Sequence, residues 1–291
     1  MSRPASRCRW TVPSKALTSP DNVSSISRFR VRPKPSRALT WISDDRFSIN
    51  GATFQALTEG FFTGNGPVVG ENDFFVCKFR SEIDDYVELF GRLAPERIFE
   101  LGVYGGGSTV LFAELARPRK LVSIDLDPLV QLRERIERHA SAIGLGRAVT
   151  VLGGVDQGDR KELARIAAEE FGECALDLVV DDCSHLYEPA RQSFNELFPR
   201  LRAGGMYIIE DWRWGHIPRG EPDPEWVPEI PLSRLIVEIV LASATLPGLA
   251  EEVTVGPNGA CITRGEASLN SVAFDVSSLT RADHLDAANP P

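Results

Sequence analysis

The sequence lacks paired cysteines, long apolar runs and an excess of positive charge, and each absence disfavours a class of protein. Its five cysteines form no CxxC pair, so we expect reduced thiols in a cytoplasmic protein rather than a disulfide framework or a zinc site. No apolar run reaches the roughly 18 residues of a membrane span, so no membrane partner is expected. The net charge of -9 repels a phosphate backbone, which disfavours nucleic acid as a partner.

Positive charge is concentrated at the N-terminus. Residues 1–40 hold nine of the 32 basic residues and one of the 41 acidic residues, and they are rich in Ser and Pro. We therefore predict a disordered basic tail over residues 1–44. A transit peptide has a similar composition, but no amphipathic helix is evident, and an overlong gene start is a further alternative.

The remaining chain is long enough for one domain with a large core. We place it at residues 45–276, followed by a C-terminal tail, 277–291. Within the domain we expect three parts: N-terminal helices and a lid (45–95), a cofactor core (96–215), and a C-terminal helix and hairpin (216–276).

Short apolar segments alternate with amphipathic ones in the cofactor core. Strands that are apolar throughout, each followed by a helix, indicate a mainly parallel sheet with helices on both faces. In such α/β sheets, ligands bind at the carboxyl ends of the strands. The strands are expected at residues 97–101, 120–124, 148–152, 176–180 and 206–209.

The first of these strands leads into a glycine-rich loop, from Glu100 to Ser108. Glycines let a ligand approach the backbone, and the following helix offers free N–H groups. The loop does not match the dinucleotide-binding motif GxGxxG, because Tyr104 occupies the position of the second glycine when the motif is counted from Gly102. The cofactor candidates in this loop are Glu100, Gly102, Tyr104, Gly106 and Ser108.

Three more cofactor candidates lie at or after the ends of the next two strands. Asp125 ends the second strand, where a carboxylate can accept both ribose hydroxyls. Because Asp127 is expected to cap the following helix, Asp125 is left for a ligand. Asp156 and Gln157 follow the third strand and are predicted to lie against an adenine edge, with a plain surface turn as the alternative.

Acidic residues end the last two strands of the core. Asp181 and Asp182 follow one strand, and Glu210 and Asp211 follow its expected neighbour. Neighbouring strands lie about 5 Å apart, and converging carboxylates repel one another unless a cation neutralises them. We therefore predict that Asp182, Glu210 and Asp211 bind Mg²⁺ or another divalent cation, and we place Asp181 at the cofactor.

A histidine follows this cluster at position 185. Imidazole titrates near neutral pH, so beside a cation-bound hydroxyl His185 suits a general base. His216, in the loop after the fifth strand, is a weaker candidate for the same role. Alternatively, a lone histidine has a purely structural role.

Three motifs carry a family resemblance: IFELGVYGGGST, LVVDDCSH and GGMYIIEDW. Together, over about residues 75–215, they resemble metal-dependent sugar O-methyltransferases of the macrocin and mycinamicin type, grouped with the rhamnosyl O-methyltransferase and cephalosporin hydroxylase family. The resemblance implies a Rossmann-like class I methyltransferase fold with a seven-stranded sheet and S-adenosylmethionine as cofactor. It also implies Mg²⁺ on Asp182, Glu210 and Asp211, with His185 as base. Cys183 stands where the family has Gly.

The acceptor is expected to be a small molecule or a sugar, and a homo-oligomeric state stays open. Two segments are rich in aromatic residues, which predicts either a lid over the acceptor or ordinary core packing. Three glycines in the first segment would allow such a lid to move. The aromatic residues are Phe61, Phe62, Phe74, Phe75, Trp212, Trp214 and Trp226, and the glycines are Gly64, Gly66 and Gly70.

Three alternatives remain. A hydroxylase or oxidoreductase would need a two-His-one-carboxylate iron site, which His185, His216 and Asp182 could supply. A non-catalytic cofactor-binding subunit has no need of the acids and His185. A phosphate-binding protein is disfavoured, because no P-loop lysine follows the glycines.

Overall fold

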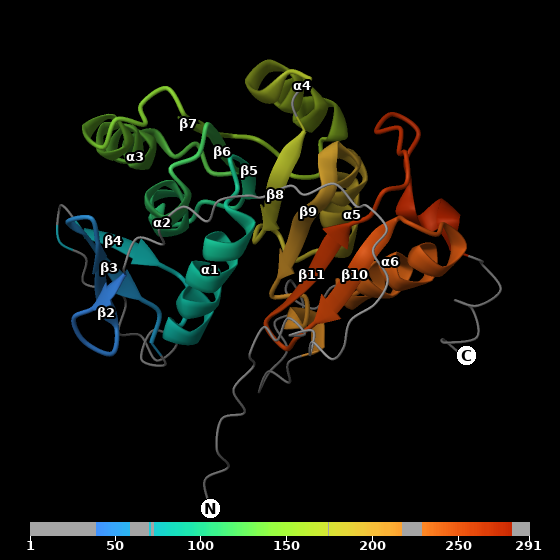
Figure 1. The fold of residues 1–291 in the computed structure, drawn as a ribbon, viewed down its shortest axis with the longest axis horizontal. Coiled ribbons are helices and arrows are strands. Elements are labelled where there is room, and N and C mark those ends of the chain that lie inside the picture. Colours follow the sequence, from blue (N-terminus) through green and yellow to red (C-terminus); the bar gives the residue numbers. More distant parts are fainter. Residues whose placement is uncertain (1–38, 59–69, 71–72, 174, 217–228, 281–291) are drawn as a thin grey trace, which may run out of the picture.

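A computed structural model describes residues 39–58, 70, 73–173, 175–216 and 229–280 of the chain. Two sheets are present: a four-stranded sheet near the N-terminus and a seven-stranded central sheet. The smaller sheet lies beside α1 (Arg80–Leu93) and α2 (Gly107–Ala116), while the central sheet crosses the middle of the molecule (Figure 1). Within the described ranges, no helix is both long and apolar enough to span a bilayer.

The central sheet has the strand order β10-β11-β9-β8-β5-β6-β7. Strands β5 to β9 pair in parallel, whereas β11 pairs antiparallel with β9 and with β10. The predicted mainly parallel, seven-stranded sheet is therefore confirmed. Its strands are β5 (Arg97–Leu101), β6 (Lys120–Asp125), β7 (Val149–Gly153), β8 (Leu176–Asp181), β9 (Leu201–Glu210), β10 (Ala250–Val255) and β11 (Gly259–Arg264).

Helices cover both faces of this sheet, because successive strand residues point to opposite sides. Ile98 packs in a core with α1, α2 and α3, whereas its neighbour Phe99 packs with α4, α5 and α6. Both residues are fully buried. The remaining helices are α3 (Val130–Ala142), α4 (Arg160–Phe171), α5 (Tyr187–Leu197) and α6 (Ser233–Thr245).

The part at residues 45–95, where N-terminal helices and a lid were expected, holds helix α1 but also strands, which precede it. Burial alternates along β2 (Arg46–Ile49) and β3 (Ala52–Ala56), which is the period of a strand. Asn50 and Gly51 join the two strands with φ of 52° and 92°, as a tight hairpin turn requires. The other strands of this sheet are β1 (Thr40–Trp41) and β4 (Asp73–Val76).

Each predicted tail includes residues that the structure shows as folded. Thr40 pairs with Ser48, so the N-terminal tail does not extend to residue 44. At the other end, Val276 is fully buried and opens a 3₁₀ turn that ends at Leu279, so residue 277 is not the start of a free tail. The rest of both segments lies outside the described residues.

Local residues decide the ends of two helices, and in one case they correct a prediction. Helix α5 ends at Leu197, and Leu201 starts β9, which runs through Gly204 and Gly205. Pro199 lies in the 3₁₀ turn between them, and a proline has no N–H to continue a helix. Asp127 is not the cap of α3: its side chain accepts the N–H of Leu129, two residues on (2.8 Å), in an Asx turn.

Candidate functional site

The glycine loop after β5 is fixed by close backbone contacts. Gly102 has a φ of +95°, and a Cβ there would lie 2.0 Å from the carbonyl oxygen of Asp182. A Cβ on Gly107 would lie 2.0 Å from the carbonyl oxygen of Phe75. The loop therefore needs glycine because the end of β8 and strand β4 both press against it.

A small cleft opens beside this loop. Gly102, Tyr104 and Ser108 line it, as the sequence predicted for a ligand site. The facing residues come from the end of β4 and from the end of β8; they are Phe75, Cys77, Lys78 and Asp182. The cleft thus lies at the carboxyl ends of the strands and next to β5 and β8, between which the strand order reverses.

Asp125 organises the loop from the end of β6. Its Oδ2 accepts the N–H groups of Val103 (2.8 Å) and Tyr104 (3.0 Å), and its Oδ1 accepts the N–H of Asp127 (3.0 Å). The carboxylate therefore lies against the loop that lines the cleft.

Glu100 lies behind the loop rather than in the cleft. It is 1% exposed, and its Oε2 accepts hydrogen bonds from the hydroxyls of Thr109 (2.6 Å) and Ser123 (2.6 Å). Burial raises its pKa, and the hydroxyl donors act against that rise. Glu100 joins β5, β6 and α2 beneath the loop. The other loop candidate, Gly106, has a φ of 75° and immediately precedes α2.

Gln157 and Asp181 form a buried polar network instead of facing an open pocket. Gln157 donates to Asp181 (2.5 Å) and accepts from the Ser184 hydroxyl (2.7 Å). Ser193 and Tyr207 donate to the other oxygen of Asp181 (3.1 Å each). Burial raises the pKa of Asp181 to about 7. The network ties the loop after β7 to the loop after β8.

Asp156 lies next to this network but is exposed, and it accepts the N–H of Gly158 (2.7 Å). Of the two residues predicted at an adenine edge, it is therefore the one with solvent access. Gln157 is 2% exposed, and its amide is occupied within the protein.

Three side chains after β8 and β9 come together as potential metal ligands. Asp182, His185 and Asp211 each offer one ligand atom, and these atoms lie within 4.8 Å of one another. His185 and Asp211 adopt φ of 54° and 50°, a region that costs non-glycine residues energy and is common at functional sites. The ring of Trp214 stacks on His185 at 5.1 Å between centroids, which fixes the imidazole plane.

Lys78 is a central residue of this cluster that the sequence analysis missed. Its Nζ donates to Asp182 Oδ2 (2.7 Å) and to Glu210 Oε2 (2.6 Å). The lysine follows β4 and is 2% exposed. The expected cation among the acids is thus provided in part by the chain itself. The only signal in the sequence was one basic residue within an otherwise apolar segment.

The ammonium group has opposite consequences for its two partners. Burial acts to raise the pKa of Asp182, but the nearby charge of Lys78 outweighs it and lowers that pKa below its ordinary value. Burial and the charge of Asp182 raise the pKa of Glu210 to about 8, despite Lys78. Asp182 is therefore the more acidic member of the pair.

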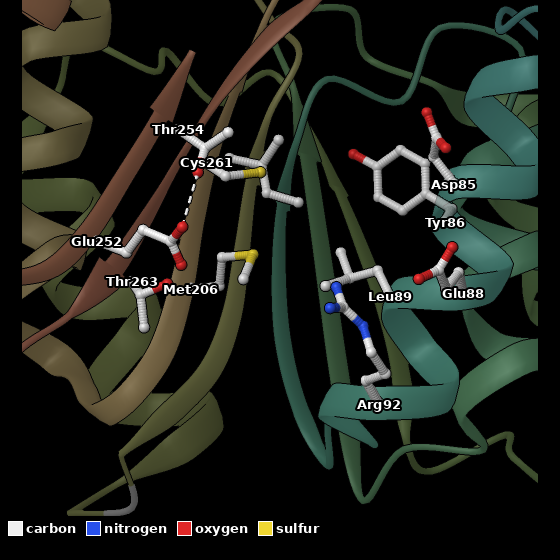
Figure 2. Close-up of a pocket in the computed structure, with 11 residues that line it drawn as sticks. Asp85, Tyr86, Glu88, Leu89, Arg92, Met206, Glu252, Thr254, Cys261 and Thr263 are labelled. Carbon is white, nitrogen blue, oxygen red and sulfur yellow. Dashed lines mark hydrogen bonds between the residues drawn. The ribbon is translucent and has the colours of Figure 1, made fainter. Parts of the chain in front are cut away.

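Glu210 also contacts Tyr86 of α1, whose hydroxyl donates to Glu210 Oε1 (2.5 Å). Tyr86 in turn lines a groove to which Glu210 itself does not contribute. Figure 2 shows the groove between α1 and the strands that carry Met206, Cys261 and Thr254. Glu210 thus lies between Lys78 and Tyr86, and the cluster of three potential ligands does not include it.

The remaining predictions for this region are partly wrong. Phe74 packs in the core at 3% exposure, whereas Phe75, at 7% exposure, lines the cleft. Both lie in strand β4 and not in a lid. Trp212 donates its indole N–H to the Gly256 carbonyl (2.8 Å). His216 contacts the Ser233 hydroxyl (2.7 Å) and is not in the ligand cluster. Phe61, Phe62, Gly64, Gly66 and Trp226 lie outside the described residues.

The fold and site together define an α/β protein with a glycine-loop cleft beside a candidate cation site. Comparison with known proteins shows what the chain is similar to. Residues 99–212 match the family model described as "Methyltransferase domain". This segment is therefore similar to methyltransferase domains, and the class I fold expected from the three motifs is the one observed.

Two curated relatives match the same region. Demethylmacrocin O-methyltransferase of Streptomyces fradiae is 32% identical over 137 residues, 44% of this chain and 31% of the relative. Mycinamicin VI 2''-O-methyltransferase of Micromonospora griseorubida is 30% identical over 178 residues, 58% of this chain and 39% of the relative. The resemblance to sugar O-methyltransferases is confirmed, although the matches span less than half the length of these relatives.

A solved structure is similar as well: the MycE methyltransferase from the mycinamycin biosynthetic pathway, in complex with Mg, SAH and mycinamycin VI. It is 25% identical, with a TM-score of 0.48, and the match covers 62% of this chain and 49% of that chain.

Proposed function

We propose that this protein is an S-adenosylmethionine-dependent, Mg²⁺-dependent O-methyltransferase that acts on a hydroxyl of a sugar or another small molecule. One observation carries the proposal: Asp182 both lines the glycine-loop cleft and belongs to the cluster of potential metal ligands. A cofactor in the cleft and a cation on the cluster would therefore be neighbours. The names of the relatives, which are O-methyltransferases of glycosylated natural products, support the substrate class.

In this proposal the cofactor contacts the residues that line the cleft. Gly102, Tyr104 and Ser108 are placed for this role, and Asp125 lies directly beneath the loop. Asp156 stays a prediction for the adenine edge. Glu100, Gln157 and Asp181 are proposed to act indirectly, because their polar atoms are bound to other side chains of the protein. Gly106 supplies the backbone turn into α2.

The residues present fit a divalent cation. Asp182 and Asp211 offer hard oxygen atoms, which suit Mg²⁺, and their ligand atoms lie within 4.8 Å of each other. Glu210 accepts hydrogen bonds from Lys78 and Tyr86. We propose that Asp182 and Asp211 hold the cation, and Glu210 stays a prediction as a third ligand. Such an ion would orient an acceptor hydroxyl and make its proton easier to remove.

His185 is the proposed proton acceptor. It lies in the same cluster as Asp182 and Asp211, and Trp214 holds its ring in place. Imidazole near neutral pH can take a proton from a hydroxyl. The protein must also hold the acceptor oxygen about 3–3.5 Å from the methyl carbon in line with the departing sulfur. The cleft wall formed by Gly102 and Tyr104 would provide that alignment.

The test measures transfer of a labelled methyl group from S-adenosylmethionine to demethylmacrocin and mycinamicin VI, with Mg²⁺ and with EDTA. We expect transfer with Mg²⁺ and none with EDTA. The same reaction run without oxygen separates this proposal from a hydroxylase, because methyl transfer consumes no oxygen. Transfer that is unchanged in EDTA would refute the metal role. A homo-oligomeric state stays a prediction.

A further inference from the structure

We propose that the groove between α1 and the strands β9, β11 and β10 binds a basic segment of this same chain, residues 28–37. This interaction is separate from the proposed methyl transfer and does not depend on it. Three observations support it: the apolar floor of the groove, the acids on its rim, and the point where the N-terminal part of the chain enters the described structure.

The groove has an apolar floor (Figure 2). Leu89 of α1 lines it together with Met206, Ile208 and Cys261 of the sheet. Leu89 and Ile208 are buried, whereas Met206 and Cys261 are partly exposed. The described residues that line the groove all come from α1 or from these three strands. An occupant with apolar side chains would therefore shield surface that these elements leave open to water.

The rim of the groove is acidic. Asp85 and Glu88 line it from α1 and Glu252 lines it from β10, against one basic lining residue, Arg92. Among the described residues, none of these three acids has an ion-pair partner. Burial, together with the charges of Glu88 and two more acids of α1, raises the pKa of Asp85 to about 6. The groove therefore favours a positively charged occupant, and an identical acidic groove of a second copy is disfavoured.

The basic segment has the complementary composition. Residues 28–37 read RFRVRPKPSR, with five basic residues and no acidic residue. Phe29 and Val31 alternate with Arg30 and Arg32, a period that places apolar and basic side chains on opposite sides of an extended chain. The two prolines that follow also favour an extended backbone. Such a segment can present apolar side chains to the floor, while its long basic side chains reach the acidic rim.

The chain enters the described structure beside the groove. Trp41 of β1 donates its indole N–H to Asp84 (2.9 Å), and the guanidinium of Arg80 lies over the Trp41 ring at 4.4 Å. Asp84 is the neighbour of Asp85 in α1, a helix of 14 residues that is about 21 Å long. Ten extended residues reach about 33 Å. Residues 28–37 are therefore long enough to cross the groove from the point where Trp41 contacts α1.

The first test measures the rate at which trypsin cleaves the full chain after Arg30, because a bound segment is protected. Glu252→Lys and Glu251→Lys are matched variants: the two glutamates are neighbours in β10, and Glu252 lines the groove whereas Glu251 does not. We expect Glu252→Lys to speed cleavage by about two- to fivefold, the range for loss of an exposed ion pair. Glu251→Lys should leave the rate unchanged. The Tm of each variant checks that the fold is intact, and equal cleavage rates in all three proteins would overturn the proposal.

Zero-length cross-linking then locates the segment on the wild-type chain. A water-soluble carbodiimide joins an amine to a carboxylate where the two are in contact, and Lys34 is the one lysine of the basic segment. We expect peptide mapping to find Lys34 joined to Asp85, Glu88 or Glu252. Lys34→Arg keeps the charge without the amine, so it should lose these links and keep the wild-type resistance to trypsin. A Lys34 that links to none of the groove acids would overturn the proposal.

Protein concentration separates the chain's own segment from that of a second copy. The cleavage rate should be independent of concentration, and the cross-linked product should run as a monomer on a denaturing gel. Protection that rises with concentration, together with cross-linked dimers, would assign the segment to a second copy and overturn the intramolecular proposal. None of these outcomes changes the test of methyl transfer, which follows the cofactor and Mg²⁺ instead.

Discussion

Replacing Gly102 with alanine tests how the glycine loop is built onto the acid cluster. The new Cβ would meet the carbonyl oxygen of Asp182 at 2.0 Å, whereas ordinary contacts begin at 3.4 Å. The two backbones must therefore separate by at least about 1 Å. The positive φ of +95° adds strain of about 1–2 kcal/mol for an L residue.

Together these effects should lower the free energy of unfolding by about 3 kcal/mol. For a domain of this size that corresponds to a fall in Tm of about 6–12 °C. Thermal unfolding followed by circular dichroism measures it. Because the displaced carbonyl belongs to Asp182, the affinity for Mn²⁺ should fall as well.

Gly154→Ala is the matched control. Gly154 has a φ of +76°, but a Cβ there meets nothing within 4 Å. Its substitution should cost only the backbone strain, about 1–2 kcal/mol, and should leave Mn²⁺ binding unchanged. Equal losses of stability in the two variants would refute the close approach of the loop to Asp182.

Three further predictions concern single side chains. His185→Ala should keep the affinity for S-adenosylmethionine but slow methyl transfer by about 10²–10⁴-fold; an unchanged rate in single-turnover assays would rule out the base. Tyr207→Phe removes a donor to the buried Asp181 (3.1 Å) and should lower the free energy of unfolding by about 1–3 kcal/mol, measured by urea unfolding; no change would show that the network is dispensable. Burial raises the pKa of the Cys77 thiol to about 11, so iodoacetamide should label it slowly at pH 8 and faster as pH rises towards 11, with Cys77→Ser as the control. Cys77 is exposed to solvent, so access does not limit the reaction, and rapid labelling at pH 8 would contradict the raised pKa.

The sequence predicted the cofactor core well because its strands are buried on both faces. Apolar runs such as RIFEL and LDLVV, each followed by a helix, are typical of strands at the centre of a parallel sheet. The acids at the ends of β8 and β9 follow from the same pattern, since parallel strands end at one edge. The hairpin after α6 was likewise predicted from its turn, and β10 and β11 flank that turn as expected.

The N-terminal sheet was missed although its turn signal was present. Asn50-Gly51 is a strong hairpin dipeptide, and alternating burial in β2 and β3 matches it. Helix α5 ends at Leu197 although the apolar residue Leu201 continues its period, because Pro199 cannot continue a helix.

Lys78 shows a second reason why the sequence alone could not predict the whole site. It bonds to Asp182 across 104 positions and to Glu210 across 132 positions of sequence, and no local pattern links residues so far apart. Counting charges at the strand ends indicated that a cation was needed, but only the three-dimensional fold shows that a lysine supplies part of it. For the same reason Gln157 was expected at a ligand and is instead bound to Asp181.

The central claim is that the cleft beside Gly102 binds S-adenosylmethionine next to a divalent cation on Asp182 and Asp211. Isothermal titration of the full chain with this cofactor, with and without Mg²⁺, tests it most directly. We predict one binding event per chain at micromolar concentration, with a heat that changes when Mg²⁺ is present. No binding at millimolar cofactor in either condition would contradict the account.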